Sequence, residues 1–279
     1  MIDVDGYLAV LGVARPGAPT SEALWALHRA QVERVAYESV DIHLDRPTGI
    51  DAAESVARIV RGRGGYCFHL NGAFGALLRA LGYDVTLHKA GVQNEAEDPE
   101  GPSGNHLALT VRLDGEPWLV DAGLGDALHE PLPLREGSYT QGPFSYAMAP
   151  STVVPGGWRF AHDPRGAFAA MVFAPEPVEL SSFAEEHVRL STAPDSGFVR
   201  VCTAQRRDAK GVDVLRGCVL RRIHGEGTDE RTVDAADDWF DVLTDVFRLD
   251  LTDVDAPARA RLWHRVRTAH EEWEAAQRP

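Results

Sequence analysis

The sequence is poor in cysteine and contains no long run of apolar residues. Its three cysteines in 279 residues, Cys67, Cys202 and Cys218, form an odd and widely spaced set. Such a set favours neither a disulfide framework nor paired metal ligands, so we expect a reduced protein without a bound metal. No apolar run reaches the roughly 18–20 residues that a membrane-spanning helix needs. The first residues carry Asp where a secretory signal carries Lys or Arg, which predicts a cytoplasmic protein without a membrane partner.

Basic residues are also scarce relative to acidic ones. The formal net charge is −14, with 28 Lys and Arg against 42 Asp and Glu. Nucleic acids and anionic membranes are bound largely through surplus basic residues, so neither is an expected partner. The densest basic cluster consists of Arg206, Arg207, Arg221 and Arg222. This cluster fits either a phosphate patch or a solvated charged face.

The hydrophobic periodicity changes along the chain. Residues 20–40, 51–62 and 67–82 have apolar positions at helical spacing, and residues 232–247 and 255–277 return to that spacing. Between these blocks the period is two, and the stretches expected to be strands are 84–92, 106–113, 116–123, 168–173, 197–205 and 213–223. A helical block followed by a mostly β block and a mixed end predicts an α+β fold with segregated layers.

Cys67 stands directly after the glycine-rich stretch "RGRGG" and at the start of an expected helix. The unpaired amides and the dipole at a helix N-terminus favour an anion, which suits a thiolate nucleophile. Gly64 and Gly65 allow a close backbone approach and leave amides available for a developing oxyanion. A buried structural cysteine is the alternative.

The stretch "HLALTVRLDGEPWLVDAGLG" predicts a hairpin whose two-residue loop is Asp114–Gly115. In that register Leu113 pairs with Glu116, and His106 and Asp121 share one face as diagonal neighbours. A thiol nucleophile normally needs a histidine base, and the base needs an orienting group. We therefore interpret Cys67, His106 and Asp121 as a catalytic triad, with a structural His–Asp pair as the alternative.

These residues resemble the arylamine N-acetyltransferase family. The resemblance is carried by "RGGYCFHLNGAFGALLRALGYDV", "NHLALTV" and "WLVDAGLGD", which match in order and spacing. Weaker similarities are "YESVDI", "DSGF" and "FRLDL", the last of which stands where the family has Phe-Gly-Ile-x-Leu.

The resemblance implies a three-part fold with a core similar to that of cysteine proteases. A helical bundle with the nucleophile spans residues 1–85, a β-barrel with His and Asp spans 86–195, and an α/β lid spans 196–279. It also implies an N-acyltransferase without a bound cofactor. Acetyl-coenzyme A or another acyl-coenzyme A acylates the cysteine, and an amine then takes the acyl group.

Further site residues follow from position and from the resemblance. Gly123, Leu124 and Gly125 border the Asp of the triad and are candidates for contact with coenzyme A, although a tight turn is the simpler interpretation. Tyr37, Phe68 and Phe198 are candidate pocket aromatics that core packing also explains. The resemblance further implies a structural ion pair between Glu38 and Arg63.

Two departures from the family pattern bear on the substrate. Ala36, Tyr37, Glu38 and Ser39 stand within a segment that is usually Pro-Phe-Glu-Asn-Leu, and His69 stands where Glu is usual. We expect His69 to be solvated or to act as a cap rather than as the base. Alternatives are an amide synthase that takes an acyl chain from an acyl carrier protein, a Cys-His-Asp hydrolase, and a binding module without catalysis.

Overall fold

The computed structural model describes residues 1–46 and 48–277. The helical segments are α1 (Val4–Leu11), α2 (Ser21–Arg34), α3 (Val40–His43), α4 (Ala52–Val60), α5 (Cys67–Ala80), η1 (Leu180–Phe183), α6 (Ala184–Thr192), α7 (Gly197–Arg200), α8 (Ala236–Asp241), η2 (Val242–Val246) and α9 (Ala256–Gln277). The strands are β1 (Tyr37–Glu38), β2 (Asp84–Gln93), β3 (His106–Leu113), β4 (Glu116–Leu119), β5 (Leu132–Pro133), β6 (Gly137–Gln141), β7 (Phe144–Pro150), β8 (Trp158–Ala161), β9 (Ala170–Pro177), β10 (Thr203–Asp208), β11 (Gly211–Arg216), β12 (Val219–His224) and β13 (Gly227–Thr232). None of the helices in this part of the chain offers an apolar stretch long enough to cross a bilayer.

The N-terminal helices form a bundle around α5. Thr20 caps α2 by accepting a hydrogen bond from the Ala23 amide, and Asp51 caps α4 in the same manner. The apolar faces of α1, α2, α4 and α5 share one core with the outer face of β2 and β3. This packing places α5 against β2 and β3 of the barrel.

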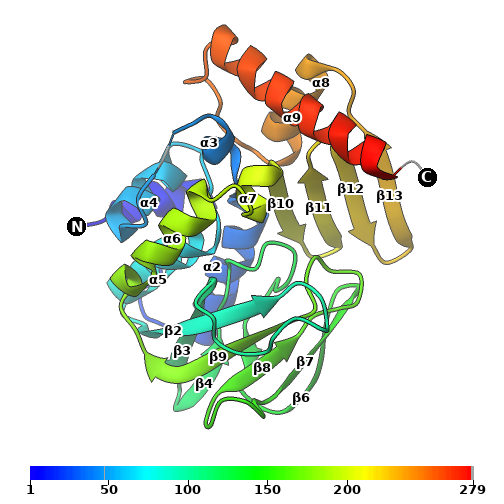
Figure 1. Ribbon diagram of the computed structural model, residues 1–279. Helices are drawn as coiled ribbons and strands as arrows, with labels where there is room; N and C mark the ends of the chain where they lie inside the picture. Colours follow the sequence, from blue (N-terminus) through cyan, green and yellow to red (C-terminus); the bar gives the residue numbers. More distant parts are fainter. Residues whose placement is uncertain (47, 278–279) are drawn as a thin grey trace.

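The central strands form an antiparallel sheet of order β5-β4-β3-β2-β9-β8-β7-β6, which curls into a nearly closed barrel (Figure 1). The β3–β4 hairpin has the predicted register, with Leu113 paired with Glu116 and Val111 with Trp118. Asp114 and Gly115 have φ of 53° and 83°, as the left-handed positions of a type I′ turn require. Both faces of β3 are buried, because its second face lines the interior of the barrel.

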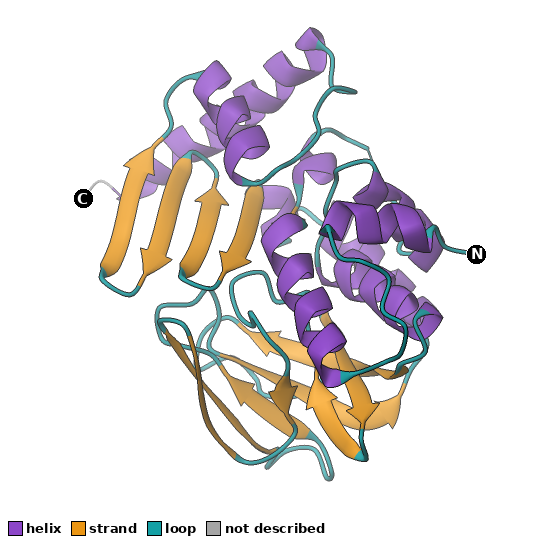
Figure 2. Ribbon diagram, turned by 180° about the vertical axis from the view of Figure 1, so that it is seen from behind, coloured by secondary structure: helices purple, strands orange, loops and turns teal. Residues whose placement is uncertain are grey.

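The C-terminal residues form a second antiparallel sheet of order β1-β10-β11-β12-β13. Figure 2 shows this sheet beside the barrel, with the C-terminal helices on one side of it. Arg207 on β10 is fully buried and donates hydrogen bonds to the carbonyls of Ala127 and Gln141. It thereby connects the second sheet to the barrel.

Two expectations about the strands are wrong. Residues 197–200 form the short helix α7, because the Ser196 side chain accepts a hydrogen bond from the Phe198 amide. Residues 213–223 form two strands, because Gly217 turns the chain with φ of 58°. The α+β class is confirmed.

The three-part division stays a proposal, and two segments cross it. Strand β1 lies within residues 1–85, yet it pairs with β10 in the C-terminal sheet. The helix α6 lies within residues 86–195, yet its Leu190 belongs to the core of the helical bundle.

Candidate active site

The glycine-rich turn before α5 is held against β1. A Cβ at Gly64 would lie 1.8 Å from the Ala36 carbonyl oxygen, so only glycine fits there. Gly65 has φ of 144° and accepts a hydrogen bond from the Glu38 amide at 2.9 Å. This turn places Cys67 as the first residue of α5, where the side chain of the capping residue Tyr66 makes no capping hydrogen bond. The positive end of the helix dipole is therefore left to act on Cys67.

His106 and Asp121 form a buried hydrogen-bonded pair. His106 begins β3, Asp121 follows β4, and the distance from His106 Nε2 to Asp121 Oδ2 is 2.7 Å. The carboxylate can only accept, so Nε2 donates and Nδ1 is left to exchange a proton with the thiol. Burial alone lowers the pKa of His106, but the Asp121 carboxylate and the neighbouring Cys67 outweigh burial and raise this pKa to about 10.

Cys67 lies beside this pair, and its sulfur is 3.8 Å from the Asn105 carbonyl oxygen. The side chain is 2% exposed, and His106 and Asp121 are equally enclosed. The structure therefore brings together the three residues predicted as a triad, from the start of α5, the start of β3 and the loop after β4. Such a dry site strengthens electrostatic interactions between them.

Asn71 is a site residue that the sequence analysis missed. It lies one helical turn after Cys67, is fully buried, and its Nδ2 donates to Asp121 Oδ1 and to the Leu107 carbonyl, both at 2.6 Å. Its Oδ1 accepts from the Ala122 amide at 3.0 Å. The side chain thus ties α5, the helix that begins at Cys67, directly to Asp121. Its i+4 spacing from Cys67 was the available signal, because residues at that spacing share one helix face.

The segment 123–125 packs closely on this arrangement. A Cβ at Gly123 would lie 2.9 Å from the Cys67 Cα and 2.8 Å from Asn71 Nδ2, so this backbone touches the start of α5. Gly125 has φ of 69°, as a tight turn requires. Leu124 is buried in the barrel core, which leaves its backbone rather than its side chain for any ligand. Contact of this segment with coenzyme A stays a prediction.

The three candidate aromatics differ in their surroundings. Tyr37 lies close to Cys67, whose charge adds to burial in raising the Tyr37 pKa well above its usual range. The Phe198 ring stacks on Tyr66 at 4.7 Å and lies 6.2 Å from the Tyr37 ring. Phe68 is fully buried and packs against Phe183 in the bundle core, which agrees with core packing, the alternative given for it above; a role in the pocket stays a prediction.

The predicted ion pair between Glu38 and Arg63 is not formed. Glu38 contacts Arg58 Nη2 at 3.3 Å, whereas Arg63 Nη2 contacts Asp41 Oδ1 at 2.6 Å. Arg58 also binds Asp41, at 2.6 Å, and so joins the two pairs into one buried network. The reason is that α4 projects Arg58 between the two carboxylates.

His69 is buried rather than solvated. Its Nε2 is 3.2 Å from Thr48 Oγ1, and its ring packs edge-on against Tyr66. Burial, together with the positive charge of Arg58, holds the pKa of His69 well below its usual value. This position on the side of α5 facing Thr48 agrees with the expectation that His69 is not the base.

The other two cysteines lie in apolar surroundings that are typical of structural cysteines. Both are buried in the C-terminal core, Cys202 just before β10 and Cys218 in the turn after β11. Burial raises the pKa of Cys218 to about 11 and that of Cys202 further. Within residues 1–46 and 48–277, no group of three or more His, Cys, Asp or Glu side chains is arranged to hold a metal ion.

Comparisons with known proteins agree with this arrangement. A model of the N-acetyltransferase family matches residues 20–256. The chain is 30% identical to the arylamine N-acetyltransferase of Gallus gallus called pineal gland isozyme NAT-3, over 74% of this chain and 77% of that protein. It is 36% identical to proansamycin X synthase of Amycolatopsis mediterranei over a shorter region, 50% of this chain and 56% of that protein.

A solved structure shows the same fold over almost the whole chain. Arylamine N-acetyltransferase of Mycobacterium marinum in complex with CoA superimposes with a TM-score of 0.85 at 27% identity, covering 96% of this chain and 99% of that one. The fold and the family model together define a transferase of acyl groups. The chain belongs to the arylamine N-acetyltransferase family.

Proposed function

We propose that this enzyme transfers an acyl group from a coenzyme A thioester to an amine nitrogen through a thioester on Cys67. The observation that carries the proposal is the hydrogen bond from His106 Nε2 to Asp121, which leaves Nδ1 for the thiol. Family membership supports acetyl transfer to amines, and the CoA complex of the similar M. marinum enzyme supports coenzyme A as the carrier of the acyl group.

In the first half-reaction, the proton of the Cys67 thiol passes to His106 Nδ1, and the thiolate attacks the carbonyl carbon of the donor thioester. We expect backbone amides at the start of α5 to stabilise the oxyanion that forms. The carbon–sulfur bond to coenzyme A then breaks, and the departing thiolate takes the proton from His106. Free coenzyme A and an acyl-Cys67 result.

In the second half-reaction, the amine nitrogen attacks the acyl-Cys67 carbonyl. His106 accepts the proton that the nitrogen loses, and the carbon–sulfur bond to Cys67 breaks. The proton returns to the sulfur, so the N-acyl product leaves a free thiol. Asp121 keeps the imidazole oriented and stabilises its charged form in both steps. The low exposure of the three side chains supports transfer over hydrolysis, because excluded water protects the thioester.

Intact-mass measurement tests this proposal directly. After incubation with a panel of acyl-coenzyme A thioesters, the wild-type enzyme should gain the mass of one acyl group, and peptide mapping should locate it on Cys67. The nearly isosteric Cys67→Ser variant should keep its fold and lose amine acylation by at least about a thousandfold. Cys218→Ser serves as the matched control. Retained acyl transfer in Cys67→Ser would refute the mechanism.

An amide synthase that takes its acyl chain from a carrier protein is a second candidate. The similarity to proansamycin X synthase over half of this chain supports a synthase as the class of enzyme, whereas the carrier-bound donor is a prediction from the sequence alone. The two candidates differ in the donor, so one experiment compares an acyl-coenzyme A with the same acyl group on a phosphopantetheinylated carrier protein. Acylation of Cys67 from the carrier alone would favour the synthase. Steady release of free acid without an amine would indicate a hydrolase instead.

A further inference from the structure

Strands β1 and β10 present two neighbouring polar side chains to the turn at Gly125. Tyr37 and Gln205 are register partners, so their side chains lie on the same face of the second sheet. A Cβ at Gly125 would lie 1.8 Å from Gln205 Oε1 and 3.4 Å from Tyr37 Cγ, so both side chains pack on this turn. The residues just before Gly125 contact the Cys67 Cα. The two polar side chains are therefore close neighbours of the triad.

Neither polar end of this pair has a partner within residues 1–46 and 48–277. The Tyr37 hydroxyl and the Gln205 amide make no hydrogen bond there, whereas Arg207, two residues further along β10, donates to two carbonyls of the barrel. Gln205 is 8% exposed, and buried amides are normally hydrogen-bonded. Neither end is among the fully enclosed polar atoms that lack a partner, so solvent reaches both. A buried, unpaired and reachable amide points to a ligand that pairs with it.

The surroundings of the pair are more open than the nucleophile. Tyr37, Gly125 and Phe198 each keep part of their surface accessible to solvent, whereas Cys67 is 2% exposed. The Phe198 ring lies 6.2 Å from the Tyr37 ring. A substrate that approaches Cys67 past these residues meets the Tyr37 hydroxyl and the Gln205 amide on its way.

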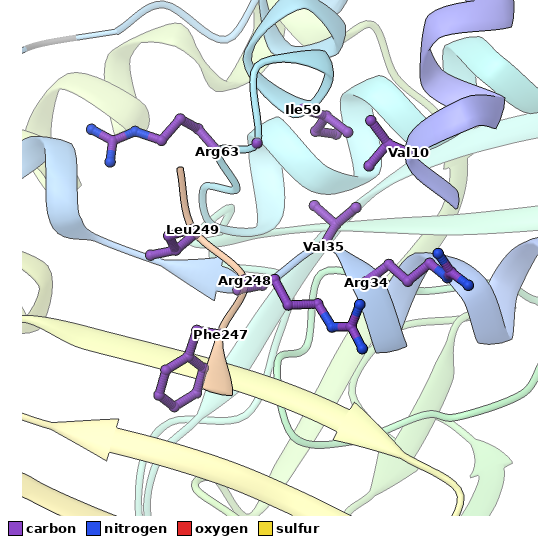
Figure 3. A pocket seen from close by; sticks show the side chains of 10 residues that line it. Val10, Arg34, Val35, Ile59, Arg63, Phe247, Arg248 and Leu249 are labelled. Carbon is purple, nitrogen blue, oxygen red and sulfur yellow. The ribbon is translucent and has the colours of Figure 1, made fainter. Parts of the chain in front are cut away.

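The pocket drawn in Figure 3, between the helical bundle and the segment after η2, is a separate feature. Its lining includes Val35, Ile59 and Phe247, which are 6%, 1% and 0% exposed, so these walls offer no surface to a ligand. Neither Tyr37 nor Gln205 lines it. This pocket therefore has no part in the arrangement around the pair.

The chemistry of the pair favours a neutral group that both donates and accepts hydrogen bonds. A glutamine side chain offers an acceptor oxygen and two donor hydrogens, and a phenol both donates and accepts. Burial and the nearby charge of Cys67 raise the pKa of Tyr37 well above its usual range, so its hydroxyl keeps its proton. A carboxylate only accepts, and it would add a negative charge near Asp121 and Asp126, whose charges also act on Tyr37. An amide group meets both requirements.

We propose that Tyr37 and Gln205 hydrogen-bond a neutral amide group of a substrate whose reacting atom lies at Cys67. The proposal rests on the acyl transfer proposed above and adds a basis for its selectivity. Two sources can supply the amide: a carboxamide on the acceptor amine, or the pantetheine arm of the donor thioester. Tyr37 stands where the similar family usually has phenylalanine, so its hydroxyl is a feature of this chain.

Acceptor selectivity tests the first source. The donor is 4-nitrophenyl acetate, which has no amide, and the acceptors are 4-aminobenzamide and 4-methylaniline, which carry an amide and a methyl group at the same ring position. Tyr37→Phe and Gln205→Met should each lower kcat/KM for 4-aminobenzamide relative to 4-methylaniline by about three- to tenfold, because each removes one hydrogen bond. Comparing this ratio between variants cancels the different reactivities of the two amines.

Acylation rates test the second source. The rate at which Cys67 gains an acetyl group, followed by intact mass without an amine, is compared for acetyl-coenzyme A and 4-nitrophenyl acetate. A fall of about three- to tenfold in both variants, confined to acetyl-coenzyme A, would place the amide on the donor. Tyr139→Phe is the matched control, because its hydroxyl donates to the Arg135 carbonyl in an exposed part of the barrel. It should keep both ratios.

Two results would overturn the proposal. Unchanged ratios in both arms, with Cys67 acylated normally, would show that the pair meets no amide. An equal loss with every substrate would show that the two side chains have only a structural role. Tyr37→Phe should keep the Tm of the wild type, because its hydroxyl has no partner to lose.

Binding measurements keep this proposal separate from the proposed function. If no donor acylates Cys67 in the wild type, the acyl transfer mechanism fails. Ligand-observed NMR with benzamide and with pantetheine needs no reaction, and at least one of them should bind about three- to tenfold more weakly to both variants. Equal binding of both ligands to the wild type and the variants would overturn the role of Tyr37 and Gln205.

Discussion

The roles and partners of the side chains around Cys67 could be predicted from the sequence to different degrees. Cys67, His106 and Asp121 could be proposed from sequence, because a helix start and a hairpin register are local properties. Asn71 and the partner of Glu38 could not, because their hydrogen bonds join segments far apart in the chain.

We predict that Asp121→Asn lowers the pKa of His106 from about 10 toward or below its usual value. Asp121 is the largest favourable influence on the imidazolium, and without its charge the effect of burial dominates. An NMR titration of His106 measures this directly. The rate of acyl transfer at neutral pH should fall by about a thousandfold or more. An unchanged His106 pKa in the variant would contradict the assignment.

The same shift predicts how stability depends on pH. The folded-state pKa of His106 lies above its unfolded value, so the stabilisation is fully present below about pH 6.5 and is lost as the pH rises toward about 10. Urea unfolding of the wild type should therefore show a free energy that decreases over this range. Asp121→Asn should show a flatter dependence, and equal slopes would argue against the charged pair.

Asn71 is expected to act as a positioning residue. Asn71→Ala removes one hydrogen-bond partner each from Asp121, Leu107 and Ala122 inside the protein, which should destabilise it by roughly 1–3 kcal/mol. Because Asp121 then orients His106 less well, kcat should fall by about tenfold to a hundredfold, as is typical for groups that orient a reacting residue. KM for the thioester should change little. Asn94→Ala, in an exposed loop, is the control, and a normal kcat in Asn71→Ala would refute the role.

Helices and strands were predicted correctly where their sequence pattern is local, and the predictions failed where the pattern is not local. The Asp-Gly turn defined the β3–β4 register because only left-handed residues close a two-residue hairpin. Strands β6 and β13 were missed because they are mostly exposed and polar, so they lack an apolar alternation. The one-turn helix α7 depends on a cap from Ser196 that outweighs the strand-like composition around it.

The segment 123–125 packs so closely against the start of α5 that a side chain at Gly123 should disturb both elements. Gly123→Ala places a methyl group 2.9 Å from the Cys67 Cα, so the loop or the helix must shift. We expect destabilisation of about 1–3 kcal/mol and a lower kcat, measured by urea unfolding and steady-state kinetics. Gly17→Ala, with no atom near the added Cβ, should change neither quantity. If both variants behave alike, the close packing is not what requires glycine.

At the scale of the whole molecule, several buried histidines are held neutral. Burial lowers the pKa of His28 to about 4, and it also lowers the pKa values of His43, His69, His88 and His187. These groups stabilise the fold above their usual pKa near 6.5, and this contribution is lost as the pH falls toward 4. The free energy of unfolding should therefore drop between about pH 6.5 and pH 4.5, although weaker repulsion among the carboxylates opposes the drop.

Replacing one of these histidines isolates its contribution. In His69→Gln, a residue that does not titrate takes the place of a buried neutral imidazole, so the dependence of stability on pH below about 6.5 should become less steep. Urea unfolding at several pH values measures the slope. The exposed His264 provides the control variant, His264→Gln. A slope identical to that of the wild type would show that His69 does not contribute.

The sequence by itself determined the order of helical and β segments, the hairpin register and the family resemblance around Cys67. These are encoded in local spacing, turn residues and backbone freedom, which do not depend on distant parts of the chain. Only the tertiary structure decided which carboxylate Arg63 meets, that Asn71 binds Asp121 and that His69 is buried. The physical reason is that a buried charge or hydrogen-bonding group pairs with whichever partner lies next to it in space. Which groups become neighbours depends on how helices and strands from distant parts of the chain pack together.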